Sequence, residues 1–66
     1  MRVRVNGNSQ EVAPGMTIAE LLHQLKLDPR FLAVERNRQL VIRKDHVACQ
    51  LEPDDEIEIV TLVGGG

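Results

Sequence analysis

The sequence predicts a small α+β domain, with one main helix at about residues 17–27 lying across one face of a mixed sheet of four to five strands. Three observations lead to this fold class. Apolar and charged residues alternate near both ends of the chain, as they do in half-buried strands. A segment with helix-start signals and a single apolar stripe lies between these strands. At 66 residues, the chain is long enough for one small domain only.

The first predicted element is a β-hairpin. Residues 1–5 form its first strand, because apolar residues at the odd positions alternate with two arginines. Asn6-Gly7 follows, a dipeptide suited to a turn that needs positive φ angles. Residues 10–12 can return as the second strand, and Pro14-Gly15 then ends the hairpin.

The predicted helix has clear start and stop signals. Thr17 can cap its N-terminus, and Glu20 lies three residues later, where it completes a capping box. Pro29 ends the helix, because a proline disfavours helical geometry at the preceding residue. Apolar residues recur at the i, i+3, i+4 and i+7 spacing of one helix face, namely Ile18, Leu21, Leu22 and Leu25.

Three further strands follow the helix. Residues 32–35 and 40–42 are predicted as short strands, residues 43–51 as an irregular segment with one helical turn, and residues 52–55 as a turn. The last strand, residues 56–63, is apolar on both faces, which is typical of a central strand. This order of elements predicts a ubiquitin-like β-grasp domain over residues 1–63, followed by a flexible glycine tail at 64–66.

Composition narrows the classes of partner and location. The net charge of −2 argues against nucleic acid as the main partner, and no apolar run approaches the length of a membrane span. A single cysteine allows no intramolecular disulfide, which a small secreted domain would normally need. We therefore expect a cytoplasmic protein that binds neither nucleic acid nor membrane.

Alternation along the last strand predicts a docking surface. If Ile57 and Ile59 face the helix, then Val60 and Leu62 face outward, beside the glycines, and form an apolar patch for a partner protein. On the same outer face, Glu56 and Glu58 would pair with the arginines at positions 2 and 4 if the first strand lies next to the last.

Cys49 and the two histidines predict no catalytic or metal site. A catalytic cysteine needs a lowered pKa and an orienting partner, and His46 three residues away establishes neither. Structural zinc usually has four ligands, and His23 is expected on the outward face of the helix. Asp54-Asp55 is interpreted as part of a turn rather than as a catalytic pair.

The glycine tail is the strongest functional signal. Gly64, Gly65 and Gly66 follow an apolar strand directly, and a segment without Cβ atoms can pass through a narrow slot into the active site of a partner. The chain has no phosphate-binding loop between a strand and a helix. Any nucleotide chemistry at the Gly66 carboxylate therefore requires a separate activating enzyme.

The whole chain resembles the ThiS family, the sulfur carriers of thiamine biosynthesis. The inner motifs are weak one by one, but together with the size and the tail they are specific. The segments that carry the resemblance are Val5-Asn6-Gly7, Met16-Thr17-Ile18-Ala19-Glu20-Leu21-Leu22, Ala33-Val34-Glu35-Arg36-Asn37, Asp55-Glu56-Ile57-Glu58-Ile59-Val60 and Gly65-Gly66.

The resemblance implies a carrier cycle in which this chain is a cosubstrate and not an enzyme. An E1-like adenylyltransferase of the ThiF type would adenylate Gly66 with ATP and magnesium, and this chain would bind no cofactor itself. Sulfur from a cysteine desulfurase or another donor would then convert the carboxylate into a thiocarboxylate. A thiazole synthase of the ThiG type would take that sulfur into the thiazole ring.

Other functions remain open from the sequence. The same tail could serve tRNA thiolation or molybdopterin synthesis, although molybdopterin carriers are usually longer. A non-covalent β-grasp binding module is an alternative of a different class. It would not need Gly66, so removal of this residue distinguishes a binding module from a carrier.

Overall fold

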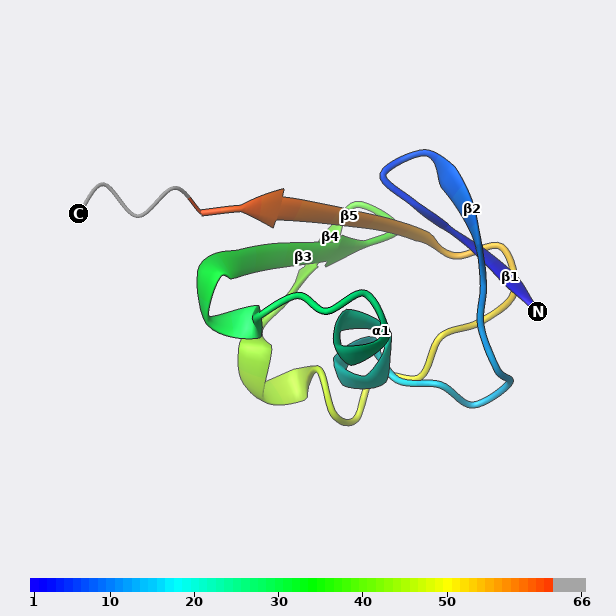
Figure 1. Cartoon of the computed structure of the whole chain (residues 1–66), viewed down its shortest axis with the longest axis horizontal. Coiled ribbons are helices and arrows are strands. Elements are labelled where there is room, and N and C mark those ends of the chain that lie inside the picture. The colour runs from blue at the N-terminus through cyan, green and yellow to red at the C-terminus, as the bar shows by residue number, and fades with distance from the viewer. Residues whose placement is uncertain (63–66) are drawn as a thin grey trace.

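The computed structural model describes residues 1–62 and contains one five-stranded mixed sheet with the order β2-β1-β5-β3-β4. Strand β5 is parallel to β1 and antiparallel to β3, so it is the central strand, as predicted. Helix α1 lies against one face of the sheet, and β5 runs toward the end of the molecule where the chain leaves it (Figure 1). The elements in chain order are β1 (Arg2–Val5), β2 (Asn8–Glu11), α1 (Ile18–Gln24), η1 (Pro29–Phe31), β3 (Leu32–Arg36), β4 (Gln39–Val41), η2 (Arg43–Asp45) and β5 (Glu56–Thr61).

The turn of the first hairpin also anchors β5. Asn6 and Gly7 have φ angles of 50° and 84°, which confirms the predicted positive-φ turn. The Asn6 side chain donates from Nδ2 to the carbonyl of Ile59 at 3.1 Å and accepts at Oδ1 from the Ile59 amide at 2.7 Å. The register between β1 and β5 covers only two residue pairs, and the Asn6 amide group continues this ladder beyond them.

Helix α1 begins where the sequence predicts. The Thr17 hydroxyl accepts from the Glu20 amide at 3.1 Å, while Glu20 Oε1 accepts from the Thr17 amide at 2.9 Å, so both halves of the capping box are present. The next two amides of the helix, those of Ile18 and Ala19, are satisfied from another segment. They donate to the carbonyls of Cys49 and His46 at 2.9 and 3.0 Å. The irregular segment after β4 therefore holds the start of the helix in place.

The helix is shorter than predicted, because it ends at Gln24 and not near residue 27. Lys26 adopts a φ of 60°, its amide donates to the carbonyl of His23, and the Leu27 amide donates to the carbonyl of Leu22. These two bonds form a Schellman motif, which stops the helix before Pro29 can act on it.

The core lies between α1 and the sheet. Apolar side chains from the helix, from strands β1, β3 and β5 and from two loop segments make one buried cluster, and Leu25 and Met16 pack against its margin. The cluster thus contains three of the four residues of the predicted helix stripe, and it brings β1 and β5 together. Its members are Val3, Val12, Ile18, Leu21, Leu22, Val34, Leu51, Ile57 and Ile59.

A polar cluster closes the sheet at the end opposite Leu62. Asp55 is buried, accepts from the Glu52 amide at 2.8 Å and from Asn37 Nδ2 at 3.0 Å, and lies 2.9 Å from Arg36 Nε. Asp54 has a φ of 67°, as suits a turn residue. The predicted turn is confirmed, and Asp55 in addition ties this turn to the one between β3 and β4.

No helix in residues 1–62 is long and apolar enough to span a membrane.

Candidate functional site

The three glycines that the sequence predicts as the functional tail, Gly64, Gly65 and Gly66, lie outside the described residues. The structure therefore describes only the surface formed by the residues that precede them in the chain. Leu62 is the last residue described, and its amide donates to the carbonyl of Phe31 at 2.7 Å. This bond fixes the chain against η1 one residue beyond β5.

The facing predicted for β5 is confirmed. Ile57 and Ile59 are buried against the helix side of the sheet, with exposed fractions of 1% and 9%. Val60 and Leu62, the predicted docking residues, are 55% and 52% exposed. Thr61 is exposed as well.

An apolar surface extends from β5 across two neighbouring strands. Ala33 on β3 lies directly opposite Val60, so both side chains stand on the outer face of the sheet. Leu40 on β4 lies opposite Glu35, which is two residues from Ala33 and therefore on that same face. Leu40 is 64% exposed. We call this set, Ala33, Leu40, Val60 and Leu62, the outer-face patch.

Charged residues cover the outer face beyond the patch. Glu58 lies directly opposite Glu35, and Glu56 lies in register with Arg4 of β1. The first strand does lie next to the last and places Arg4 in register with Glu56, as predicted, but within residues 1–62 neither arginine forms an ion pair with Glu56 or Glu58. Arg2 instead pairs with Glu11 at 3.1 Å, because the hairpin places Glu11 directly opposite it.

Element η1 holds an ion pair at the tail end of the molecule. Asp28 caps η1 by accepting from the Arg30 amide at 3.0 Å, and its carboxylate lies 2.7 Å from Arg30 Nη2. The hydrogen bond from the Arg30 side chain lowers the pKa of Asp28 to about 2. The Arg30 guanidinium also lies 5.3 Å from the ring centre of Phe31, within the range of a cation–π contact. These contacts support the carbonyl to which Leu62 is bonded.

Cys49 and His46 make contacts that hold the fold together. The Cys49 sulfur is 3.4 Å from Arg36 Nη1, in contact with the polar cluster, and His46 is buried with Nε2 3.0 Å from the Val41 carbonyl oxygen. In the described part of the chain, no three His, Cys, Asp or Glu side chains are grouped so that they could hold a metal ion.

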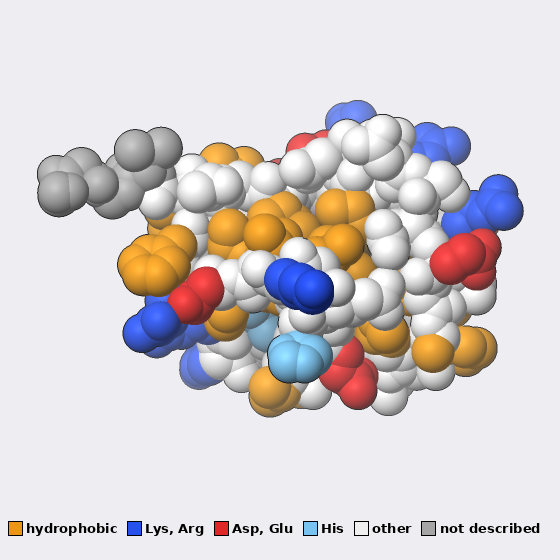
Figure 2. Space-filling view, viewed as in Figure 1, with side chains coloured by type: hydrophobic (Ala, Val, Ile, Leu, Met, Phe, Trp, Pro, Cys, Tyr) orange, Lys and Arg blue, Asp and Glu red, His pale blue; other side chains and the backbone are white. Residues whose placement is uncertain are grey.

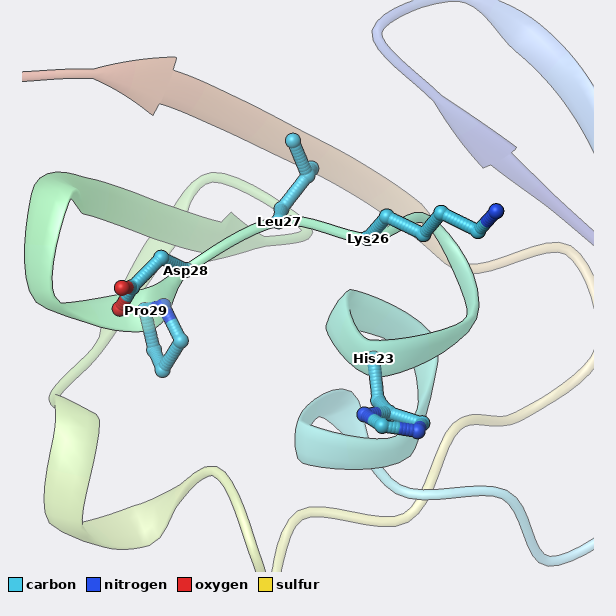
Figure 3. A pocket seen from close by; sticks show the side chains of 5 residues that line it. All are labelled: His23, Lys26, Leu27, Asp28 and Pro29. Carbon is cyan, nitrogen blue, oxygen red and sulfur yellow. The ribbon is translucent and has the colours of Figure 1, made fainter.

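An open depression of about 510 Å³ lies beside the end of α1. The side chains that line it do not converge on a point: Leu27 points away from His23 (Figure 3). His23 is exposed, as predicted for the outward helix face. In the space-filling view, apolar atoms are exposed between the sheet and the helix (Figure 2).

Sequence reasoning found two of the four patch residues. Alternation along β5 identified Val60 and Leu62, whereas Ala33 and Leu40 could be added only once the strand order was known. For Ala33, the alternation of residues 32–35 already indicates that it shares one face of its strand with Glu35.

Comparison with known proteins agrees with this architecture. The model described as the ThiS family matches residues 3–66. The sulfur carrier protein ThiS of Bacillus subtilis is 38% identical over 50 residues, which are 76% of each chain. The crystal structure of the thiamine biosynthesis protein ThiS from Geobacter metallireducens superimposes with a TM-score of 0.87 at 30% identity and covers all of both chains.

A further relative is a thiazole synthase of Magnetococcus marinus, 39% identical over 66 residues. The match includes the whole of this chain but spans only 20% of that protein, about a fifth of its length. The family model, the bacterial carrier and the solved structure all point to the same family, and the solved structure shares the fold described above. The chain belongs to the ThiS family, and its fold is the ubiquitin-like β-grasp.

Proposed function

We propose that this chain is a sulfur carrier of thiamine biosynthesis that works through its Gly66 carboxylate. The observation that carries the proposal is the position of β5. The strand that precedes the glycines in the sequence is central, is held on both sides, and has an exposed apolar residue, Val60, on its outer face. The family match, which extends to residue 66, supports the same conclusion.

The chemistry follows from the nature of a terminal carboxylate. An α-carboxyl group has a pKa of about 3.3–3.7, so Gly66 is ionised at neutral pH and nucleophilic toward phosphorus. Its oxygen attacks the α-phosphate of ATP in the activating enzyme, and pyrophosphate leaves. Sulfide then attacks the acyl carbon of the adenylate, AMP leaves with the bridging oxygen, and a thiocarboxylate remains. A persulfide from a desulfurase would instead form an acyl disulfide, which a thiol must then reduce to release the thiocarboxylate.

This chain supplies only the carboxylate, and the other components of the reaction come from its partners. It presents a carboxylate at the end of a short glycine segment, since three glycines can span at most about 10 Å. The activating enzyme supplies the nucleotide site with its magnesium, and a desulfurase or another donor supplies the sulfur. This chain is consumed and recharged in each cycle, so its role is that of a cosubstrate.

A thiazole synthase is the proposed acceptor. The support for this partner is that the thiazole synthase of Magnetococcus marinus contains a segment similar to the whole of this chain. A carrier and a synthase joined in one polypeptide are expected to act on each other. We therefore expect this chain to donate sulfur to a thiazole synthase of the same class.

The test is the intact mass of the chain after incubation with a ThiF-type activating enzyme, Mg-ATP and a cysteine-derived sulfur source. We expect the mass shift for replacement of one oxygen by sulfur. The shift should be absent without ATP and absent when Gly66 is deleted. An unchanged mass with several competent activating enzymes would refute the proposal and favour a non-covalent binding module.

The acceptor is tested in a second step with the loaded chain. Addition of a ThiG-type thiazole synthase and its other substrates should return the chain to its starting mass as sulfur is transferred. If the loaded chain gives up its sulfur only to tRNA-thiolation or molybdopterin-synthesis enzymes, the carrier chemistry stands but the pathway is a different one.

A further inference from the structure

Two glutamates of the outer face are placed in an unfavourable pair. Glu35 on β3 and Glu58 on β5 lie directly opposite each other, and both side chains are exposed. Like charges at directly opposed positions of an antiparallel pair destabilise a sheet. The register therefore places two like charges next to each other on the outer face of the sheet.

Within residues 1–62, the basic side chains that form ion pairs do so with other carboxylates. Arg2 pairs with Glu11 and Arg30 pairs with Asp28. Arg36, although adjacent to Glu35 in the chain, belongs to the opposite face of β3 and lies 2.9 Å from Asp55. Arg4 lines a small hollow together with Glu58, but among the described residues neither outer-face glutamate forms an ion pair.

The glutamate pair adjoins the outer-face patch. Along β5, Val60 is two residues from Glu58, and along β3, Ala33 is two residues from Glu35, so all four share one face. Leu40 lies directly opposite Glu35 on the other side. The surface next to the tail thus combines an apolar area with two uncompensated negative charges.

We propose that the outer-face patch docks on the activating enzyme, and that an arginine or lysine of that enzyme lies between Glu35 and Glu58 in the complex. A guanidinium matches the geometry of carboxylates, and binding would remove the repulsion that the free domain carries. The charge pair would thereby set the orientation of the domain, because apolar contact alone is not directional.

The activating enzyme is the partner to which this inference applies, and the inference rests on the proposed function. That enzyme binds the chain before any sulfur is present, so recognition depends on the protein surface and the tail alone. A cation placed beside the patch would align the tail with the nucleotide site. Partner surfaces without this cation would be rejected, since they leave two buried carboxylates unpaired.

The test compares Glu35→Gln and Glu58→Gln with Glu56→Gln as the matched control. Glu56 is a glutamate of the same strand and face, but it lies in register with Arg4 and away from the patch. Thermal unfolding is measured for each free domain. Affinity for a ThiF-type enzyme that loads the wild-type chain in the mass assay is measured at low and at high salt.

We expect opposite effects on stability and on binding. Each of the two substitutions should raise the melting temperature by about 1–8 °C, and the double variant should gain no more than the better single one. Each should weaken binding roughly three- to tenfold at low salt, and the loss should shrink at high salt. Glu56→Gln should leave affinity within about twofold of the wild type.

Unchanged or tighter binding by Glu35→Gln and Glu58→Gln, with the wild-type chain still loaded, would overturn this inference and leave the carrier function intact. Failure of every enzyme to load the wild type would instead overturn both. A fall in melting temperature would also contradict the inference, because the pair would then be stabilising within the domain itself.

Discussion

The Asn6 side chain is the most informative single position for testing how β5 is held. Its amide group replaces a pair of backbone groups opposite Ile59, with hydrogen bonds of 3.1 and 2.7 Å. The backbone ladder between β1 and β5 is short, since its register ends at the pair Val5 and Ile57. We therefore predict that truncation of this one side chain destabilises the whole domain.

The expected loss can be worked out for Asn6→Gly. Two intramolecular hydrogen bonds contribute about 1 kcal/mol each, and the greater freedom of glycine in the unfolded chain costs about 0.5–1 kcal/mol more. The total of about 2–3 kcal/mol is a large share of the roughly 3–10 kcal/mol expected for the free energy of unfolding of a domain of this length. It corresponds to a melting temperature lower by about 10–20 °C.

Two companion variants separate the contributions. Asn6→Ala removes the same bonds but must also adopt the φ of 50°, which adds about 1–2 kcal/mol, so it should be less stable than Asn6→Gly. Asn6→Asp keeps the acceptor for the Ile59 amide but turns a carboxylate toward the Ile59 carbonyl. Its deficit relative to the wild type should shrink as the pH falls through about 4, where a protonated carboxyl can donate.

The assay is urea unfolding followed by circular dichroism, combined with amide hydrogen exchange at Ile59. The exchange rate of this amide should rise more in Asn6→Gly than the rates of amides in the β3–β4 hairpin. If Asn6→Gly loses less than about 0.5 kcal/mol and exchange at Ile59 stays slow, the side chain is not the anchor that its geometry indicates.

Three further predictions concern the surface, the thiol and one carboxyl. Leu62→Ser should weaken binding to the activating enzyme but leave the melting temperature nearly unchanged, because the side chain is half exposed, and unfolding of the variant would contradict the assigned facing. Cys49→Ser should still give the sulfur mass shift; a folded variant that cannot be loaded would give the thiol a chemical role. The pKa of Asp28 should be about 2 by NMR titration and return toward 3.8 in Arg30→Ala. Because this pKa is lowered by folding, the ion pair stabilises the domain fully above about pH 4, and its contribution is lost as the pH falls toward 2.

Features encoded within a few residues were predictable from the sequence. The capping box of Thr17 and Glu20 and the turn at Asn6-Gly7 need only local geometry, and the structure confirms both. The helix end was predicted too late, because Lys26 takes a conformation for which glycine is the usual signal. A lysine at this position does not signal a helix end, so the sequence alone points to Pro29 as the residue that ends the helix.

Features that depend on strand order could be predicted only in part. Alternation placed Val60 and Leu62 on the outer face, but it could not show that Ala33 and Leu40 lie beside them. Asp55 was interpreted only as a turn residue, since its burial depends on Arg36 and Asn37, which are distant in the chain. Long-range side-chain contacts of this kind leave no periodic pattern in a single sequence.

The central position of β5 has a consequence for biosynthesis. Before this strand leaves the ribosome, the β1–β2 and β3–β4 hairpins have no common neighbour, and isolated hairpins are marginally stable in water. The core would also lack Ile57 and Ile59. We expect nascent chains stalled after β4 to be degraded readily by added protease, and chains that include β5 to resist it. Truncated chains that lack β5 would then be removed by proteolysis, and only chains translated through β5 would remain available to bind a partner.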